Sequence, residues 1–281
     1  MQGEHSEKTR YSLRPELGGF STMRASYVTQ TFSRHIHEEY AVGFIERGAM
    51  AFRYRGSNLV ASAGTVNLVV PGEAHDGHCA TGHGWIYRMF YLPPELLTRA
   101  ASELGACSGM PHFRRGVIED PALARKILQT HRLLDRPASS RLEREISLLR
   151  MLTFWIMRHA EEPGRAPEAG HEPRAVRLAR EYMHDAMAED VGLDHLAGLS
   201  GLSRFHFARV FEKTTGISPH AYLLQTRVNR ARILLETSAR RLADIAAECG
   251  FADQSHLTRS FRRQFGLTPG HYRKIIQNSR A

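Results

Sequence analysis

The C-terminal fold is decided by the stretch ECGFADQSHLTRSFRRQFGLTPGHYR, which runs from Glu248 to Arg273. Together with the apolar residues just before it, this stretch predicts two short helices separated by a tight turn at Gly250. Asp253 offers a side-chain oxygen as the N-cap of the second helix. The buried face of that helix is expected to consist of Leu257, Phe261 and Phe265, which recur every four residues. This pattern indicates a helix-turn-helix unit.

The same unit occurs a second time upstream. FEKTTGISPHAY, beginning at Phe211, aligns with FRRQFGLTPGHY, beginning at Phe261, at an offset of 50 residues. Such self-similarity predicts two copies of one small structural unit. In the first copy Ser203 is the expected cap, and the expected buried stripe is Phe207, Val210 and Phe211. Residues 219–236 between the copies carry an uninterrupted helical pattern, so we expect one long helix that fixes the two units relative to each other.

Burial of these stripes turns polar side chains outward on the opposite face of each second helix. Gln bonds an adenine edge and Arg a guanine edge in bidentate fashion, so such a face can read base pairs in a major groove. Packing on the long helix is an alternative role for Phe205, and contact with phosphates is one for Arg262. The outward positions that we assign to DNA binding are Arg204, Phe205, Ala208, Arg209, Gln254, Ser255, Thr258, Arg259 and Arg262.

Residues 174–274 resemble the DNA-binding domain of the AraC/XylS family of transcription regulators. The resemblance rests on Gly-Phe, a capping Asp, Leu-x-x-x-Phe, Gly-x-Thr-Pro and Tyr-Arg. Members of this family activate transcription through RNA polymerase more often than they repress it, so the resemblance implies an activator. No local motif decides between activation and repression. The resemblance also implies that bases are read by Phe205, Ala208, Arg209, Gln254, Ser255, Thr258 and Arg259, with Ala208 limited to apolar contact such as a thymine methyl.

The composition is that of a globular protein long enough for two domains. Apolar residues make up 42% and charged residues 24% of the 281 residues, which favours neither disorder nor a membrane protein. The net charge of +9 is concentrated in residues 173–281, where 17 Lys and Arg stand against 10 Asp and Glu. Phosphate backbones and anionic membranes both attract such a cluster, and ordinary solvated Arg residues are the third interpretation.

Cysteine usage and hydropathy indicate the compartment. The 3 Cys residues form no CxxC pair, so the sequence predicts neither a disulfide framework nor a zinc knuckle and fits a reducing cytosol. The first residues lack an apolar signal core, and the longest apolar stretch, 148–157, is too short to span a bilayer. We therefore expect a cytoplasmic protein without a membrane anchor.

Short apolar alternations with frequent Gly and Pro mark residues 23–91 and predict an all-β domain, a small barrel or sandwich. Residues 20–95 resemble the cupin-type sensor barrel that is common in the same family and usually binds small organic ligands. His35 and His37 share one face because side chains alternate along a strand. The effector pocket is expected to be lined by His35, His37, Tyr54, His75 and Arg88.

The same histidines raise the question of a metal. Cupin enzymes typically bind one through two His and a Glu of a first motif and a His of a second. Here the positions expected for the Glu fall on Ala41 or Val42, so the metal set is incomplete. Three imidazoles can still hold zinc or iron with open positions, and purely structural histidines are the remaining option. We expect an organic effector, with no metal and no other cofactor.

The leading interpretation is an effector-responsive transcription regulator that is not an enzyme. A cupin metalloenzyme with a DNA-binding tail needs the complete metal set, and the chain shows no phosphate loop, nucleophile elbow or HExxH site. An architectural nucleoid protein requires sequence-independent binding, which outward Gln and Arg side chains argue against.

These patterns predict a two-domain α+β protein, with a cupin-like β-barrel followed by helices and then an all-α domain. Helices at 121–134 and 141–159 either pack on their own barrel or pair between the subunits of a homodimer. The expected boundaries are 1–160 for the sensor part (barrel about 20–95, helices about 119–160), 161–173 for a Pro- and Gly-containing linker, and 174–281 for the DNA-binding domain (helix-turn-helix units at about 193–214 and 241–264).

Overall fold

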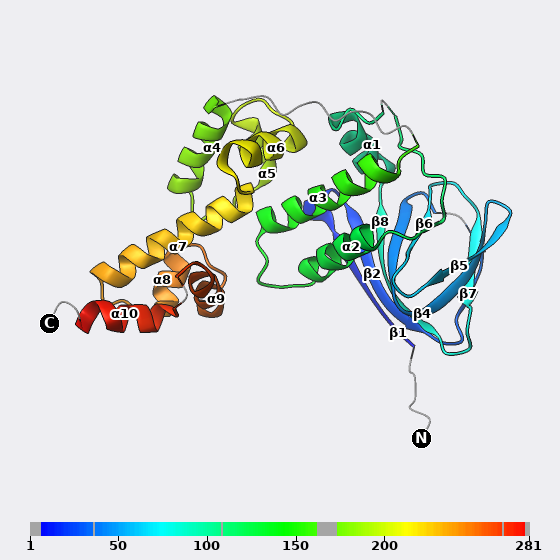
Figure 1. Ribbon diagram of the computed structural model, residues 1–281, viewed down its shortest axis with the longest axis horizontal. Coiled ribbons are helices and arrows are strands. Elements are labelled where there is room, and N and C mark those ends of the chain that lie inside the picture. The colour runs from blue at the N-terminus through cyan, green and yellow to red at the C-terminus, as the bar shows by residue number, and fades with distance from the viewer. Residues whose placement is uncertain (1–6, 36, 108, 162–172, 266, 279–281) are drawn as a thin grey trace, which may run out of the picture. The chain divides into compact units, whose positions relative to one another are not determined.

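The computed structural model of the chain confirms a sheet-rich N-terminal unit and an all-helical C-terminal unit (Figure 1). The first unit comprises residues 1–135 and 148–167, and the second comprises residues 136–147 and 168–281. Most of the expected linker lies outside the described residues, which are 7–35, 37–107, 109–161, 173–265 and 267–278. Among the helices formed by this part of the chain, none combines the length and the apolar character that crossing a bilayer requires.

The described residues of the first unit form nine strands, all paired antiparallel. The strands are β1 (Lys8–Arg14), β2 (Phe20–Tyr27), β3 (Thr31–His35), β4 (Tyr40–Tyr54), β5 (Ser57–Ser62), β6 (Val66–Val69), β7 (His75–Cys79), β8 (Trp85–Leu92) and β9 (Val117–Ile118). The main order is β1-β2-β8-β4-β6-β9, while β4 also pairs with β5 and β7, and β7 with β3.

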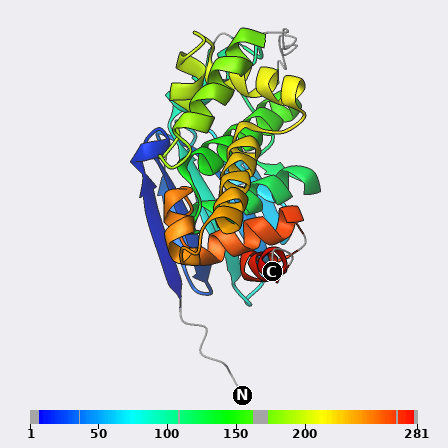
Figure 2. The same cartoon turned by 90° about the vertical axis from the view of Figure 1, so that its left-hand side faces the viewer.

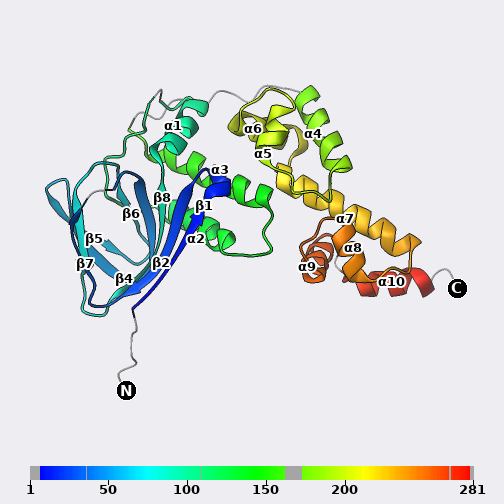
Figure 3. The same ribbon diagram turned by 180° about the vertical axis from the view of Figure 1, so that it is seen from behind.

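Strand β4 is long enough to serve both parts of the sheet. Its first half pairs with β6 and β8, and its second half pairs with β5 and β7. The register shifts between Ile45 and Arg47, where the strand passes from one set of partners to the other. Gly48 follows this bulge with φ of 70°, and a Cβ there would lie 2.0 Å from the carbonyl oxygen of Gly84. Only glycine fits this crossing, and Figure 3 shows the strongly curved sheet to which β4 belongs.

The interior of the folded sheet follows the two-residue alternation of the strands. Side chains from β2, β4, β5, β6 and β8 meet in one buried cluster. Its largest members are Ile45, Met50, Phe52, Tyr54, Trp85, Tyr87 and Met89. This core surrounds the cavity described below.

Three helices accompany the sheet, namely α1 (Pro94–Glu103), α2 (Pro121–Leu134) and α3 (Arg141–His159). The last two match the predicted ranges. Asp120 caps α2, accepting hydrogen bonds from the amide nitrogens of Ala122 at 2.9 Å and Leu123 at 3.1 Å. The other carboxylate oxygen of Asp120 pairs with Arg158 at 2.7 Å and His159 at 2.9 Å, so one residue joins the start of α2 to the end of α3.

A buried ion network fastens α2 to the sheet. The guanidinium of Arg88 on β8 donates to Glu46 on β4 and to Asp135 just after α2, and its Nη1 lies 3.0 Å from Nδ1 of His131. Burial, together with the charge of Arg88, lowers the pKa of His131 to about 4. The neutral ring therefore accepts from Arg88 and donates through Nε2 to the carbonyl oxygen of Met23 at 3.1 Å.

The second unit consists of short helices arranged around one long helix (Figure 1, Figure 2). The helices are α4 (Pro173–Asp185), α5 (Leu193–Gly198), α6 (Arg204–Thr215), α7 (Pro219–Thr237), α8 (Leu242–Glu248), α9 (Gln254–Phe265) and α10 (Pro269–Asn278). Helices α5 and α6 form the first predicted helix-turn-helix, and α8 and α9 form the second. The long helix α7 runs from one pair to the other.

The predicted stripes and caps of both helix pairs are confirmed. Ser203 caps α6 by accepting from the amide of His206 at 3.2 Å, and Asp253 accepts from the amide of His256 at 2.6 Å. Gly201 and Gly250 take the left-handed conformation in the two turns. Fully buried stripe residues are Phe207, Val210, Phe211, Leu257 and Phe261, whereas Phe265 is half-buried and rests on Phe261 with ring centroids 4.7 Å apart.

The loop after α4 holds the two helix pairs together. Arg227, in the middle of α7, is buried and donates to the carbonyl oxygens of Met187 at 2.6 Å and Glu189 at 2.9 Å. In the turn of the second pair, a Cβ on Gly250 would lie 2.6 Å from the same Met187 oxygen. Because the loop touches both the long helix and the second turn, we expect the second unit to move as one body.

The boundary between the units differs from the sequence-based one. We expected all of 1–160 to belong to the sensor part, but the first residues of α3, within 136–147, cluster with the second unit. Glu145 is buried there, and its Oε2 accepts a hydrogen bond from the amide of Leu193 at 2.6 Å. Helix α5 begins after Gly192, which has no side chain to cap it, so a carboxylate distant in the sequence supplies the cap.

Candidate functional site: a helix-turn-helix surface and a histidine-lined cavity

Helix α9 presents a polar row on the face opposite its buried stripe. Gln254, Ser255, Arg259 and Arg262 are exposed. Thr258 is half-buried, and its hydroxyl donates to the carbonyl oxygen of Gln254 at 2.8 Å. The structure therefore brings all five residues assigned to this helix onto one accessible side, with side chains that suit base edges and phosphates.

Helix α6 differs from α9 in how its assigned residues are placed. Phe205 is 4% exposed and Ala208 is 6% exposed, so neither presents an accessible side chain in this structure. Arg204 pairs with Asp194 at 3.3 Å. The apolar character of Phe205 and Ala208 favours their burial.

Arg209 on α6 is an unsatisfied cation. Its Nε and Nη2 atoms are buried and have no hydrogen-bond partner among the described residues. Burial lowers the pKa of its guanidinium, because the charged form loses hydration. A buried donor without an acceptor destabilises a protein, so these two nitrogens lower the stability of this part of the fold.

The first unit contains a cavity of about 140 Å³ within the folded sheet. The side chains that line it are mostly apolar and aromatic, including Met23, Phe32, Met50, Phe52, Val69, Tyr87, Met89 and Tyr91. Its polar lining includes His35, His37, Asn67, His75 and Asp76. A concave, largely apolar space with a few polar groups is typical of a small-molecule site.

Two of the residues expected in this pocket lie elsewhere. Arg88 belongs to the ion network that holds α2, because alternation along β8 turns it away from the cavity that Tyr87 and Met89 line. Tyr54 is buried in the core near the cavity without lining it, and its hydroxyl accepts from the amide of Val70 at 3.4 Å.

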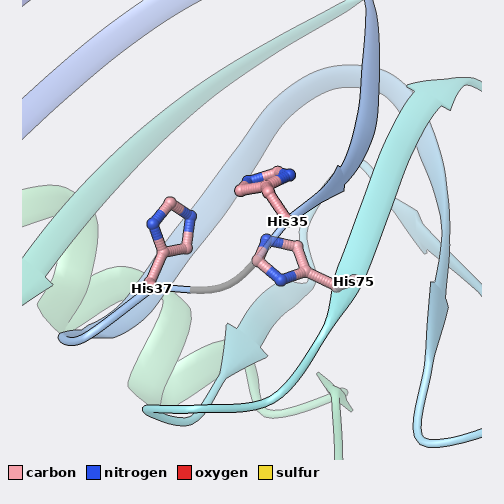
Figure 4. Close-up of side chains that lie close together, drawn as sticks. All are labelled: His35, His37 and His75. Carbon is pink, nitrogen blue, oxygen red and sulfur yellow. The ribbon is translucent and has the colours of Figure 1, made fainter.

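The three histidines expected in the pocket do come together (Figure 4). Their ring centroids lie 4.3 Å apart for His35 and His75, 4.9 Å for His35 and His37, and 5.0 Å for His37 and His75. Burial lowers the pKa of His37, and burial outweighs a hydrogen bond to Glu73 in lowering that of His75 to about 4. Both rings are therefore neutral at pH 7.

Sequence reasoning missed Asn67 on β6. The residue is 2% exposed, and its Oδ1 has no hydrogen-bond partner among the described residues. Its Nδ2 lies 3.5 Å from the sulfur of Met89. The available signal was a single amide within the apolar run VNLVV at 66–70, on the same strand face as Val69. Such a group gives a ligand one orienting polar contact.

Comparison with known proteins assigns both units. Residues 17–152 match the model of the AraC-like ligand binding domain, and residues 196–275 match that of a helix-turn-helix domain. The HTH-type transcriptional regulator YbfI of Bacillus subtilis, named as uncharacterized, is 31% identical over 254 residues, which cover 90% of each chain. The chain belongs to the AraC/XylS family of transcription regulators.

Two further proteins are similar to this chain. The transcriptional activator RhaS of Shigella sonnei is 26% identical over 86% of this chain and 88% of its own length. A crystal structure of a regulator with an AraC-type DNA-binding domain from Chromobacterium violaceum is 30% identical over 36% of this chain and 91% of its own, with a TM-score of 0.35. This AraC/XylS member is a DNA-binding transcription regulator with a ligand-binding domain, and not an enzyme.

Proposed function

We propose that this regulator is an effector-responsive activator that reads two successive major grooves of promoter DNA with each subunit. The observation that carries the proposal is the polar row of α9 above its buried Leu and Phe stripe, repeated in part on α6 within one rigid unit. Two recognition helices on one body reach the same face of B-DNA when their sites lie about 34 Å apart.

The DNA contacts that we infer come from both helix pairs. On α9 they involve Gln254, Ser255, Thr258 and Arg259 at base edges and Arg262 at phosphates. On α6 the unsatisfied Arg209 is the principal candidate, with Arg204 beside it. Phe205 and Ala208 contribute packing in the free protein, which supports assigning less of the base readout to α6 than to α9.

The effector is proposed to be a small organic molecule held in the cavity of the first unit. A space of about 140 Å³ suits a ligand of roughly the size of one aromatic ring. Effector binding then shifts the population of dimer arrangements that place the helix-turn-helix units on one promoter. The relative RhaS is named a transcriptional activator, which supports activation as the proposed direction of control. Contact with RNA polymerase and a cytoplasmic location are part of the same proposal.

Selection of binding sites from randomised duplexes tests the DNA-reading part of the proposal. We expect the purified protein to enrich a bipartite motif whose two blocks lie about one helical turn apart. Binding that is equal for selected and unselected duplexes at moderate salt would instead indicate a nonspecific architectural protein.

A second experiment tests the effector site separately. A library of small organic acids, phenols and sugars is screened for compounds that raise the thermal unfolding temperature of the protein. A compound that does so should fail with Gly77→Leu, which fills the cavity beside Phe32 and Met50, and should still act on Val60→Ala, an exposed position. A compound that stabilises both variants equally binds outside this cavity.

A further inference from the structure

We propose that His35, His37 and His75 bind one divalent transition-metal ion of the zinc class in the cavity of the first unit, leaving one coordination position open toward the remaining space. The inference deepens the proposed effector site, but the binding of the metal itself does not depend on an organic effector. It reverses our sequence-based expectation of a site without metal, and the reasons are geometric.

Two of the three nitrogen donors lie on strands that the sheet register sets side by side, and the third lies two residues beyond the end of β3. His35 ends β3 and His75 begins β7, and they are direct partners across the strand pair. His37 follows two residues later, and Figure 4 shows its ring turned toward the other two. Donor nitrogens of all three rings lie within 4.8 Å of one another. Tetrahedral zinc with bonds near 2.0 Å needs about 3.4 Å between donors, which small ring rotations provide.

Backbone carbonyl groups orient two of the rings for metal binding. Nδ1 of His35 lies 2.7 Å from the carbonyl oxygen of Ser33, and Nδ1 of His75 lies 3.3 Å from that of Glu73. A carbonyl oxygen only accepts hydrogen bonds, so each Nδ1 carries the proton and each Nε2 presents a lone pair. Donation of the second ring nitrogen to a carbonyl oxygen is the usual outer-sphere arrangement of metal-bound histidine.

The alternative of a structural cluster explains less. Converging lone pairs on neighbouring imidazoles repel one another, and a core of this kind is more stable when apolar residues fill it. Apart from Asn67 and Asp76, the surrounding side chains are apolar or aromatic, so the sheet does not need polar rings there for packing. A cation between the three nitrogens converts the repulsion into coordination.

The donor set limits the identity of the ion. Three imidazoles suit zinc, copper, nickel or iron, whereas magnesium and calcium require oxygen ligands. Ala41, which occupies a position expected for a fourth ligand, lines the same cavity and cannot coordinate. The open position therefore faces a space bordered by Ala41 and the unsatisfied Asn67, where a small carboxylate or phenolate could complete the coordination.

The test uses the full chain without a histidine tag, stripped with a chelator and then titrated with Zn²⁺ by calorimetry. We expect one equivalent in the wild type, and in the double variant His35→Ala/His75→Ala an affinity lower by on the order of 100-fold or more. The matched control is His78→Ala, because His78 lies on the same strand as His75 but is exposed, and it should bind like the wild type.

A second measurement on the wild type needs no variant and guards against misfolding of the double variant. Co²⁺ bound at the site should give the visible absorption of a tetrahedral complex, and added azide or acetate should change that spectrum if one position is open. Zinc stoichiometry well below one, an octahedral spectrum, or full binding by the double variant would overturn the proposal. Site selection on DNA can still succeed in that case, so failure of the metal site is distinguishable from failure of the regulator function.

Discussion

Arg259 and Arg262 lie on the same exposed face of α9, but we expect them to contact different parts of the DNA. Arg259→Ala should relax the preference at one base pair by about 1 to 3 kcal/mol, because a bidentate contact to guanine is lost. Arg262→Ala should weaken binding to all sequences alike. It should also reduce the slope of log affinity against log salt concentration by about 1, since one phosphate contact is lost. Competition binding with single base-pair substitutions in the selected site measures both. A uniform loss for Arg259→Ala would contradict its assignment.

Replacing Arg209 should have opposite effects on stability and on DNA binding. Its buried nitrogens lack partners among the described residues, so Arg209→Met should raise the free energy of unfolding by about 1 kcal/mol. The same variant should bind the selected DNA more weakly, because it loses the cation that we expect to meet the DNA. Urea unfolding and DNA titration of one preparation provide the two numbers. A variant that is less stable, or that binds DNA as tightly, would show that Arg209 already has its partner.

Asp120 makes the first unit sensitive to acid. Burial raises the pKa of Asp120, but hydrogen bonds from Leu123, His159 and Ala122 and the charge of Arg158 outweigh this, so the pKa lies below its ordinary value of 3.8. A carboxyl with a lowered folded-state pKa stabilises the fold above its unfolded pKa, and this contribution is lost as the pH falls through the folded value.

Asp120→Asn keeps an oxygen for the helix cap but removes the titration. The free energy of unfolding of the wild type should therefore fall more steeply than that of the variant below about pH 4. Denaturant unfolding between neutral and acidic pH measures this slope, and Asp185→Asn, at an exposed carboxylate, serves as the control. Parallel curves for Asp120→Asn and the wild type would contradict the assigned role.

The sequence predicted single positions well where periodicity alone decides burial. Leu257 and Phe261 are buried because their spacing repeats the helical turn. His35 ends β3, and His37, two residues further along, also lines the cavity. Arg88 was misplaced although the alternation of side chains along β8 separates it from its cavity-lining neighbours Tyr87 and Met89. The contact between His35 and His75 depended on strand register, which a single sequence does not encode locally.

Among the helices, α5 depends on a cap that it does not contain. Glu145→Ala should lower the free energy of unfolding of the second unit by about 1 to 2 kcal/mol, because the amide of Leu193 loses its acceptor at 2.6 Å. Glu145→Gln should lower the free energy of unfolding by less, because the amide oxygen of Gln still accepts the hydrogen bond from Leu193. The control is Glu181→Ala, which removes only an exposed pair with Arg177 and should change stability by less than about 0.5 kcal/mol.

Chemical unfolding of the three variants distinguishes these outcomes. Equal stability of Glu145→Ala and the wild type would mean that water replaces the carboxylate at no loss. The bounds of α2 and α3 followed from their amphipathic patterns, yet the contact between Glu145 and Leu193 could not. The two residues are 48 positions apart, and no local preference specifies a pairing at that separation.

At the scale of the whole molecule, we expect the second unit to accept only operators whose two blocks have one fixed spacing. Helix α7 has 19 residues and is therefore about 28 Å long, and Arg227 ties it to the loop at Met187 and Glu189. Inserting either 5 or 10 base pairs between the two blocks of the selected site should abolish simultaneous contact, because a rigid body cannot follow either the rotation or the separation. Band-shift titration of the three duplexes measures this. Recovery of affinity with the longer insertion would indicate that the two helix pairs move independently.

The division into a sheet-rich and a helical unit could be predicted because each half carries its own hydrophobic period. The exact boundary could not, since residues 136–147 precede the Pro- and Gly-containing segment but belong with the helices that follow it. Composition identifies a connecting segment, whereas membership of a compact unit depends on tertiary contacts such as those of Glu145.

The cap that Glu145 provides for α5 affects how this regulator can be engineered. Chimeric regulators are conveniently made by fusing the ligand-binding half of one relative to the DNA-binding half of another at the intervening segment. In such a fusion the acceptor for Leu193 would come from the foreign half, and a relative without an acidic residue at the position of Glu145 would leave α5 uncapped. Fusions joined before Arg136 keep the native pair together and should show the higher operator affinity.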